Sequence, residues 1–408
     1  RFLHRSRGLG DVYKRQVEDT QRSLVFDPES VIQNVVGSYD VIDVFGEVSV
    51  PLLADKAFAQ DLTLDAAIRF SDYSTVGQTT TWNAGGSWTP ISDSFRLRGS
   101  YSVSVRAPNV DELFSPSQGA FFRPVDPCDS AEIAALNAAG DPRGPIRAAN
   151  CAATGISPTF TDPLTARFVG ETRGNPSLDE EEAETFSLGA IITPEFLPGL
   201  TVTLDYWDIT IEDAIDSPSG QDIVDGCYDS ATFPVNPFCD LIRRNDDATS
   251  PQFNGLEFIS QQQLNIGKLE ATGLDFAARY QFEIRATEIE LGLSGTKMDK
   301  LDRFFDPLDP TAVDPELGEL QRPEWAGNFT ASASFGPIRL GYQMQYMDEQ
   351  ALRDVEIETV DSLYGPAGIA DATYLHDLSF SWDVNDRYMI YGGINNVGDE
   401  TPFLTEFA

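Results

Sequence analysis

The sequence has no long apolar segment, little positive charge and almost no histidine. Its longest wholly apolar runs, such as residues 189–192, are far shorter than the ~20 residues that a membrane-spanning helix needs. Any segment that crosses a membrane must therefore be a strand. Lys and Arg number 28 against 65 Asp and Glu, a formal net charge of −37, which leaves no electrostatic basis for a nucleic-acid partner.

Residue combinations that carry catalysis are also lacking. Of the two histidines, His376 has no second histidine beside it for a zinc site, and the chain contains neither a Gly-x-Ser-x-Gly elbow nor a phosphate-binding glycine loop. His376 shares its predicted strand face with Tyr374 and Leu378, so we interpret it as a packed or interfacial residue. We predict that the chain is not an enzyme and binds no cofactor.

Two acidic clusters in predicted loops are candidates for calcium binding. They comprise residues 179–182 and the group Asp306, Asp309, Asp314 and Glu316. Neither cluster has the ordered ligand spacing of an EF-hand. We therefore interpret both as solvated loop charge and predict no metal site.

The first sixteen residues differ in composition from the rest of the chain. They hold five of the 28 basic residues and one acid, so residues 17–408 alone carry a formal net charge of −41. The stretch lacks the apolar core and the cleavage site of a secretory signal. We interpret residues 1–16 as a non-native leader and residues 17–408 as one domain.

Alternation of apolar and polar side chains with a period of two dominates the sequence and is typical of β-strands. In residues 95–106 it places Arg96, Arg98 and Arg106 on one face. Because 41% of the residues are hydrophobic and 11% aromatic, the chain should fold despite its charge. Twelve strands are predicted, at residues 42–52, 62–71, 78–90, 95–106, 183–194, 200–213, 258–283, 288–298, 325–335, 338–349, 372–384 and 387–397.

Connector length separates a barrel from a soluble sandwich, whose strands also alternate. Short and long links alternate along the chain, except for a short link at 73–77. The short links are 91–93, 195–199, 336–337 and 385–386, and the long ones are 108–182, 214–257, 299–324 and 350–371. Outer-membrane barrels have short turns on the periplasmic side and long loops outside. We therefore predict an all-β fold, a transmembrane antiparallel up-and-down barrel.

All four cysteines lie in the two longest predicted loops. Cys128 and Cys151 are in one loop, and Cys227 and Cys239 are in the other. Since no Cys-x-x-Cys spacing occurs, local pairs in oxidising surroundings favour disulfides over a metal site. We predict the bonds Cys128–Cys151 and Cys227–Cys239, although four cysteines permit three connectivities.

Several segments resemble the barrel of TonB-dependent receptors. The segment Arg106-Ala107-Pro108-Asn109-Val110-Asp111-Glu112-Leu113-Phe114 resembles the family signature Arg-Ala-Pro-x-x-x-Glu-Leu-Phe/Tyr at the outer end of a strand. After a long loop, the segment Gly174-Asn175-Pro176-Ser177-Leu178-Asp179-Glu180-Glu181 resembles Gly-Asn-Pro-x-Leu-x-Pro-Glu, with Glu180 where proline is usual. Phrases at 204–211, 267–275 and 394–399 are similar to later strands, in the family order.

The signature residues suggest architecture more than ligand contact. Pro108 lacks an N–H and should end the strand ladder. Arg106 continues the inward polar row, and we expect it to pair with an acidic neighbour on an adjoining strand.

The resemblance implies a barrel of twenty-two strands around an N-terminal plug. This chain would hold about twelve of those strands and would lack the plug, the TonB-contacting segment and the last strand. The family lies in the outer membrane of Gram-negative bacteria, contacts outer-membrane lipid and takes energy from the TonB complex through the N-terminal part. Its ligand is a small-molecule nutrient such as a ferric siderophore, a corrinoid or a saccharide, and the loop acidity disfavours a strongly anionic one.

Two other classes of protein remain open at this point. One is a plugless outer-membrane porin or adhesin, and the other is a secreted β-rich glycan-binding protein or hydrolase. An upstream plug domain would favour the receptor, whereas a signal peptide running straight into strands would favour a porin. Because a barrel spans the membrane only when its strand edges are paired, we also expect residues 17–408 by themselves to aggregate rather than insert.

Overall fold

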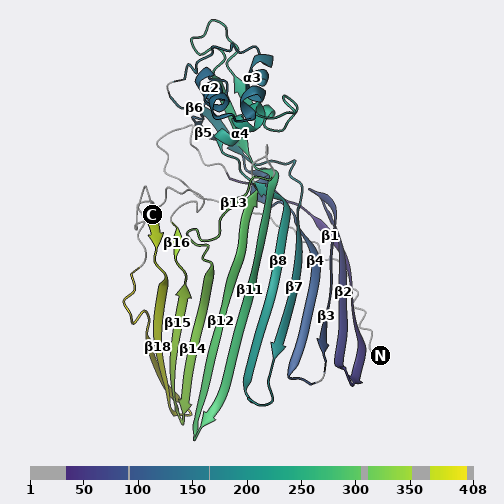
Figure 1. Ribbon diagram of the computed structural model, residues 1–408, viewed down its shortest axis with the longest axis vertical. Coiled ribbons are helices and arrows are strands. Elements are labelled where there is room, and N and C mark those ends of the chain that lie inside the picture. The colour runs from purple at the N-terminus through teal and green to yellow at the C-terminus, as the bar shows by residue number, and fades with distance from the viewer. Residues whose placement is uncertain (1–33, 91, 165, 305–310, 352–367, 402–408) are drawn as a thin grey trace.

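The computed structural model describes residues 34–90, 92–164, 166–304, 311–351 and 368–401. Its main element is a curved antiparallel sheet, which we call the wall, in which long strands pair in chain order (Figure 1). The strands are β1 (Val41–Lys56), β2 (Ala59–Tyr73), β3 (Gly77–Thr89), β4 (Phe95–Arg106), β7 (Glu181–Ile192), β8 (Leu200–Asp216), β11 (Leu264–Ile284), β12 (Thr287–Phe304), β14 (Trp325–Phe335), β15 (Ile338–Met347), β18 (Thr373–Asn385) and β19 (Tyr388–Ile394). Each of the twelve predicted strands contributes to this sheet, so the antiparallel up-and-down fold is confirmed.

One predicted strand was wrong in its extent. The sequence indicated a single strand over 258–283, but the structure divides it at Gln263 into β10 (Leu256–Gln262) and β11. β10 pairs with strands outside the wall, whereas β11 pairs with β8 and β12. The pattern of apolar and polar residues does not say which partner a strand will take, so the change of partner at Gln263 could not be read from the sequence.

The two faces of the wall differ in polarity because opposite residues of antiparallel strands share a face. Tyr101 lies opposite Phe186 and continues an apolar row, whereas Arg98 lies opposite Gly189, which lies opposite Asp205. The apolar face is solvent-exposed, as at Leu188, which is 52% exposed. The polar face is the concave one, because two hollows of ≈ 430 and ≈ 420 Å³ in the wall are lined mainly by its side chains.

Connectors of different length leave from opposite ends of the wall. Short turns, such as 285–286 and 336–337, lie at the lower end in Figure 1. The long connectors 107–180 and 217–263 lie at the upper end, as the alternation of lengths predicted. Residues 352–367 of the predicted long link at 350–371 lie outside the described residues.

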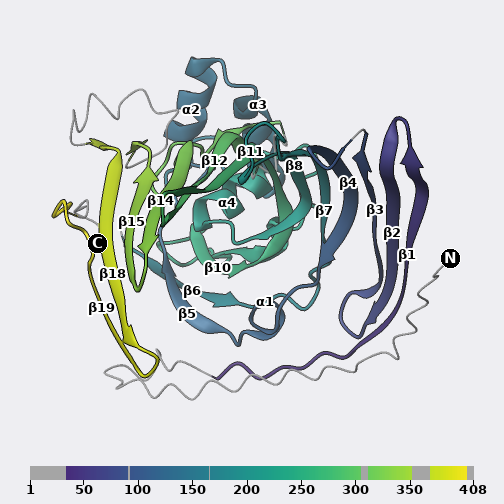
Figure 2. The ribbon, with the colours of Figure 1, turned by 90° about the horizontal axis from the view of Figure 1, so that it is seen from below.

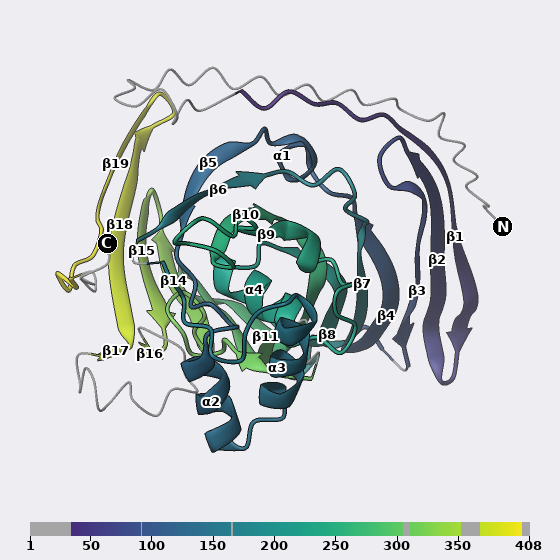
Figure 3. The same cartoon turned by 90° about the horizontal axis from the view of Figure 1, so that it is seen from above.

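The two longest connectors are not irregular loops. Residues 107–180 and 217–263 fold together into a compact unit above the wall, which we call the cap, and from above its centre lies within the curve of the strands (Figure 3). Its sheet has the order β5-β6-β10-β9, and a parallel pairing of β6 with β10 joins the two connectors. The cap elements are α1 (Val110–Phe114), β5 (Gln118–Phe122), α2 (Ser130–Ala139), α3 (Arg143–Ala153), β6 (Phe168–Arg173), α4 (Gly220–Tyr228), the 3₁₀ helix η1 (Cys239–Leu241), β9 (Ile242–Arg244) and β10.

The wall is not closed into a ring. Among the described residues, β1 and β19 each have one neighbour in the sheet, and a gap separates them (Figure 2). Short strands near the upper end complete the described structure, namely β13 (Asp314–Pro315), β16 (Gln350–Ala351) and β17 (Ile369–Ala370). In the described ranges, every helix is too short or too polar to cross a membrane.

Candidate functional site

The signature segment turns the chain from the wall into the cap. β4 ends at Arg106, and the buried Pro108 follows, with no N–H to continue the ladder. The side-chain oxygen of Asn109 accepts hydrogen bonds of 2.9 Å from two backbone N–H groups in the first turn of α1. Glu112 accepts a return bond of 2.7 Å from the Asn109 N–H, which completes a capping box, and Leu113 is buried.

Arg106 ties this turn to its neighbours. Its Nε donates to Glu181 Oε2 at 2.5 Å, and its Nη1 donates to Glu112 Oε2 at 3.0 Å. Glu181 is the register partner of Arg106 on β7, and its Oε1 also accepts a bond of 2.7 Å from the Ile215 N–H on β8. One guanidinium therefore links the tops of three wall strands to α1, and the acidic neighbour expected for Arg106 is Glu181.

The second motif closes over the first, although about sixty residues separate them. The Gly174 N–H donates to the Ser115 carbonyl at 2.9 Å, and a Cβ at Gly174 would lie 2.7 Å from the Ser115 nitrogen. Asn175 is buried, and its Nδ2 donates to the Gln263 carbonyl at 2.9 Å, at the break between β10 and β11. Leu178 is buried as well. Both motifs thus form one rim corner where the cap meets the wall.

The remaining signature residues complete this corner without polar side chains. Ala107 is half-buried between β4 and Pro108. The ring of Phe114 at the end of α1 lies against Gly37, where a Cβ would come within 2.3 Å of it. Pro176 is exposed. These contacts support the architectural interpretation of the signature.

The cap has an apolar core of its own. Phe122 and Phe168 of the cap sheet pack with Ile259 and with Ile223 and Val224 of α4, and the last three are fully buried. These residues come from both connectors. Burial of their side chains away from water drives the two connectors together.

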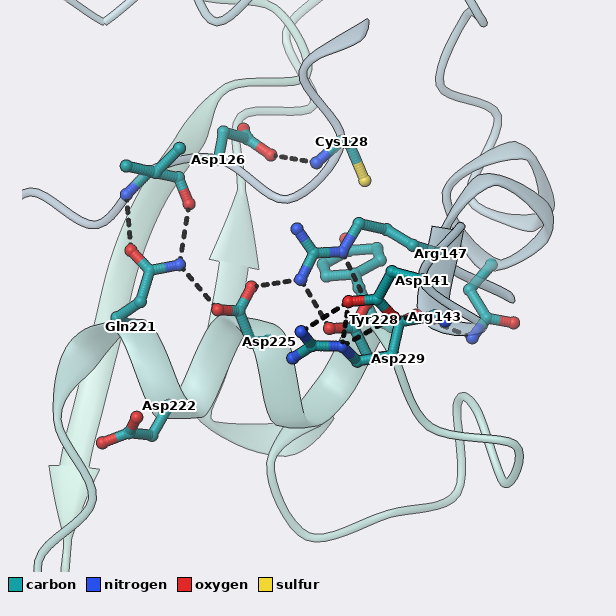
Figure 4. Close-up of polar contacts among 12 residues, drawn as sticks. Asp126, Cys128, Asp141, Arg143, Arg147, Gln221, Asp222, Asp225, Tyr228 and Asp229 are labelled. Atoms are coloured by element: carbon teal, nitrogen blue, oxygen red, sulfur yellow. Dashed lines mark hydrogen bonds and ion pairs between the residues drawn. The ribbon is translucent and has the colours of Figure 1, made fainter. Parts of the chain in front are cut away.

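A buried ion-pair network also joins the two connectors (Figure 4). Arg147 of α3 donates two hydrogen bonds of 2.5 Å to Asp229 and one of 2.8 Å to Asp225. The Asp229 side chain is 0% exposed and that of Arg147 is 8% exposed. Burial raises the pKa of Asp225, and the neighbouring Arg147 offsets this only in part. By contrast, exposed Arg143 lowers the pKa of Asp141 to about 2 through hydrogen bonds.

A second buried ion pair also contacts α4, through Tyr228. Arg244 of β9 makes two hydrogen bonds of 2.7 Å to the fully buried carboxylate of Asp126. Its Nε donates to Tyr228 Oη at 2.6 Å, and its guanidinium carbon lies 4.8 Å from the centroid of that ring. The charges in the cap interior are therefore paired and hydrogen-bonded, as buried charges must be.

A polar pocket of ≈ 320 Å³, which we call the rim pocket, opens between the rim corner and the cap sheet. Its lining is dominated by uncharged amide and hydroxyl side chains. The residues used below are Asp111, Gln118, Thr172, Arg173, Gln261, Gln262 and Gln263.

A comparison with family models decides what kind of sheet the wall is. Residues 5–397 match the model described as "TonB dependent receptor-like, beta-barrel". The chain belongs to this family. The resemblance inferred from the signature at Arg106 is therefore confirmed, and the wall is part of a TonB-dependent receptor barrel.

Solved structures with the same fold include two bacterial receptors. A variant of the ferric enterobactin receptor PfeA from Pseudomonas aeruginosa matches with a TM-score of 0.56 and 14% identity, over 90% of this chain and 41% of its own. The siderophore receptor PirA from Acinetobacter baumannii matches with a TM-score of 0.54 and 12% identity, over 89% and 42%. The chain thus spans about two fifths of the length of these receptors.

In this receptor barrel the cysteines bond within their own connectors. The structure has the disulfides Cys128–Cys151 and Cys227–Cys239, the same pairs that the sequence analysis proposed. Cys128, Cys151 and Cys227 belong to the apolar core of the cap. Sequence reasoning missed that core, and the one signal for it was the presence of cysteine pairs in both connectors.

The acidic clusters are only partly solvated, which corrects the first interpretation. Glu181 pairs with Arg106, and the buried Glu316 pairs with Arg303 and Arg322. These two carboxylates form ion pairs because cationic side chains on adjoining segments lie within reach of them. Within the described part of the chain, no group of three or more His, Cys, Asp and Glu is arranged to hold a metal ion.

Other residues from the sequence analysis have plain positions. A hydrogen bond of 2.8 Å joins His376 Nδ1 of β18 to the Tyr342 hydroxyl of β15, and the two rings are stacked. It is a packed residue of the wall. Residues 1–16, Asp306 and Asp309 lie outside the described residues.

Proposed function

We propose that this chain is part of an outer-membrane receptor that imports a scarce small-molecule nutrient with energy from the TonB complex. The observation that carries the proposal is the polarity of the wall. An exposed apolar face on long antiparallel strands fits lipid, and a polar concave face fits an aqueous lumen. The family match supports the same conclusion.

The proposal places the long connectors outside the cell and the short turns in the periplasm. The cap then lies over the outer mouth of the lumen, where it meets the incoming nutrient first. Ferric siderophores, corrinoids and saccharides are the candidate ligands, and siderophore receptors among the similar structures support the first class. TonB and its energy would reach the barrel through an N-terminal plug.

Epitope tags test the orientation. A tag inserted after Gly140, the exposed C-cap of α2, should be detected on intact cells that express the full-length gene. A tag between Gly336 and Pro337 should be detected only after the outer membrane is opened. Detection of the second tag alone on intact cells would reverse the orientation.

Uptake tests the function itself. The full-length protein should migrate as a heat-modifiable band in the outer-membrane fraction, as barrels do. Accumulation of labelled nutrient should require both this protein and TonB. Accumulation that persists at the same rate without TonB would instead support the porin alternative.

A further inference from the structure

The rim pocket lies on the same face of the cap sheet as the apolar core. Gln118 of β5 pairs in register with Thr172 of β6, and Thr172 pairs with Gln261 of β10. Two residues farther into each strand lie Ala120, Gly170 and Ile259. Side chains two apart share a face, so the row of Gln118, Thr172 and Gln261 continues the core face toward the rim.

α4 covers the apolar row of Ala120, Gly170 and Ile259 but does not extend over the polar row of Gln118, Thr172 and Gln261. Gly220 at the start of α4 lies over Phe122 and Ile259, since a Cβ there would be 2.8 Å from the Phe122 ring and 3.7 Å from Ile259 Cδ1. Ser217, which precedes α4, already lines the pocket. The outer part of the face is therefore apolar and covered, whereas the part at the rim is polar and open.

The amides of the pocket have unused hydrogen-bonding groups. Gln261 Nε2 donates to the Pro218 carbonyl at 2.8 Å, and no partner among the described residues reaches its Oε1. Within the same described ranges, the side chains of Gln118 and Gln262 form no hydrogen bond. Each amide carries an acceptor and two donors. The pocket thus presents donors and acceptors side by side, which is the pattern that a row of hydroxyl groups requires.

The charges around the pocket argue against an anionic ligand. Arg173 is the cation in its lining, and it already donates to Ser260 at 3.0 Å and lies 3.4 Å from Glu171. Asp111 in the lining is exposed. The cap as a whole has 17 acidic and 7 basic residues, a net charge of −10. An anion would be repelled on its approach.

We propose that the rim pocket binds an uncharged polyhydroxylated ligand of the saccharide class, and that its free glutamine amides recognise the hydroxyl groups. Its volume lies at the small end of the range of about 300–1,000 Å³ for small-molecule sites, which fits a short segment of a glycan. The inference rests on the proposed uptake function. A saccharide ligand would distinguish this chain from the enterobactin receptor, which it resembles in fold.

Direct binding to the purified full-length protein in detergent tests the proposal. The probes are fluorescently labelled neutral oligosaccharides of glucose and of xylose, a ferric tris-catecholate and an uncharged ferric trihydroxamate. The test variant carries Gln118→Met and Gln262→Met, which keep side-chain length and remove the amides. The matched control is Gln252→Met, an exposed glutamine of the cap outside the pocket. Hydrogen exchange in α4 and β10 verifies that the cap of each variant is folded.

We expect at least one neutral oligosaccharide to bind, with affinity reduced on the order of tenfold or more in the double variant and unchanged in Gln252→Met. Binding of the tris-catecholate or the trihydroxamate in place of saccharides would overturn the ligand class. Saccharide binding that the double variant leaves unchanged would overturn the site. If binding follows the expected pattern but accumulation in cells does not need TonB, the proposed function fails and the pocket assignment stands.

Discussion

The wall and the cap are built from the same residue types but arrange them in opposite ways. In the wall, apolar side chains such as Leu188 are 52% exposed, whereas Ile259 in the cap is 0% exposed. Ion pairs differ in the same sense. The Arg98 side chain on the concave wall is 48% exposed, and that of Arg147 in the cap is 8% exposed.

The difference indicates the surroundings in which each region is stable. The wall leaves its apolar face unburied by protein, so lipid has to supply the apolar surroundings. The cap buries its own apolar surface and pairs its own charges, as a small water-soluble domain does. Changes inside the cap should therefore unfold the cap and leave the wall intact, and changes inside the wall should do the reverse.

The largest effect is expected for Arg147→Met. It leaves the buried carboxylate of Asp229 without a partner, which costs about 3–5 kcal/mol. Hydrogen exchange of the full-length protein should then show loss of protection in α3 and α4 and none in β4 or β7. Arg143→Met on the same helix is the control, because its pair with Asp141 is exposed and screened by solvent, so its loss should leave cap stability almost unchanged. Equal losses in both variants would contradict this account of the cap.

Removal of either disulfide of the cap should be the next largest effect. The double variant Cys227→Ser, Cys239→Ser loses on the order of 3 kcal/mol of cap stability, because the bond restricts the unfolded loop. Loss of Cys128–Cys151, which closes a loop about twice as long, should cost about 0.6 kcal/mol more. Urea titration followed by hydrogen exchange measures both. A wall that melts together with the cap would show that the two regions are one cooperative unit.

In the wall, Gly189→Ala should destabilise by at most about 1 kcal/mol, because the Asp205 carboxylate can move aside and its pair with Arg98 is partly exposed. Arg98 donates to Asp205 at 2.8 and 2.6 Å across the intervening strand, and a Cβ at Gly189 would lie 1.9 Å from Asp205 Oδ1. In the heat-modifiability assay, the full-length variant should unfold at a lower temperature than the parent protein. Hydrogen exchange in α4 should be unchanged. Gly46→Ala is the matched control, because no atom lies within 4 Å of its Cβ position. The same temperature for both variants would refute the steric argument.

The smallest effect concerns pH. The pKa of Asp225 is raised by burial in the folded cap, so the folded state holds its proton more tightly than the unfolded state. Its contribution to cap stability is greatest below the ordinary aspartate pKa of 3.8 and falls as the pH rises through the folded pKa. Hydrogen exchange of α4 across this range should show a weaker pH dependence in Asp225→Asn than in the parent. An identical pH dependence in the two proteins would rule out this assignment.

The wall could be predicted because its signal is local. Alternation within each strand, as in 95–106, reports the two faces without knowledge of any neighbour. The cap could not, because its core joins Phe122 to Ile223 and Ile259, which lie about a hundred residues away or more. No period in the sequence connects them. The pairing of Arg106 with Glu181 was accessible from motif order, whereas the row of Gln118, Thr172 and Gln261 required the register of three cap strands.

The placement of the two disulfides bears on how the protein is assembled. Among the described residues, each disulfide lies within one connector, and none joins the two connectors. A bond between the connectors would tie the β4–β7 hairpin to the β8–β11 hairpin even before β7 and β8 had paired. With the bonds as they are, each connector can be oxidised while its hairpin is still separate from the other. The contacts of Arg147 with Asp229 and of Arg244 with Asp126 join the two connectors without a covalent bond, so a complete cap holds the β4–β7 and β8–β11 hairpins next to each other.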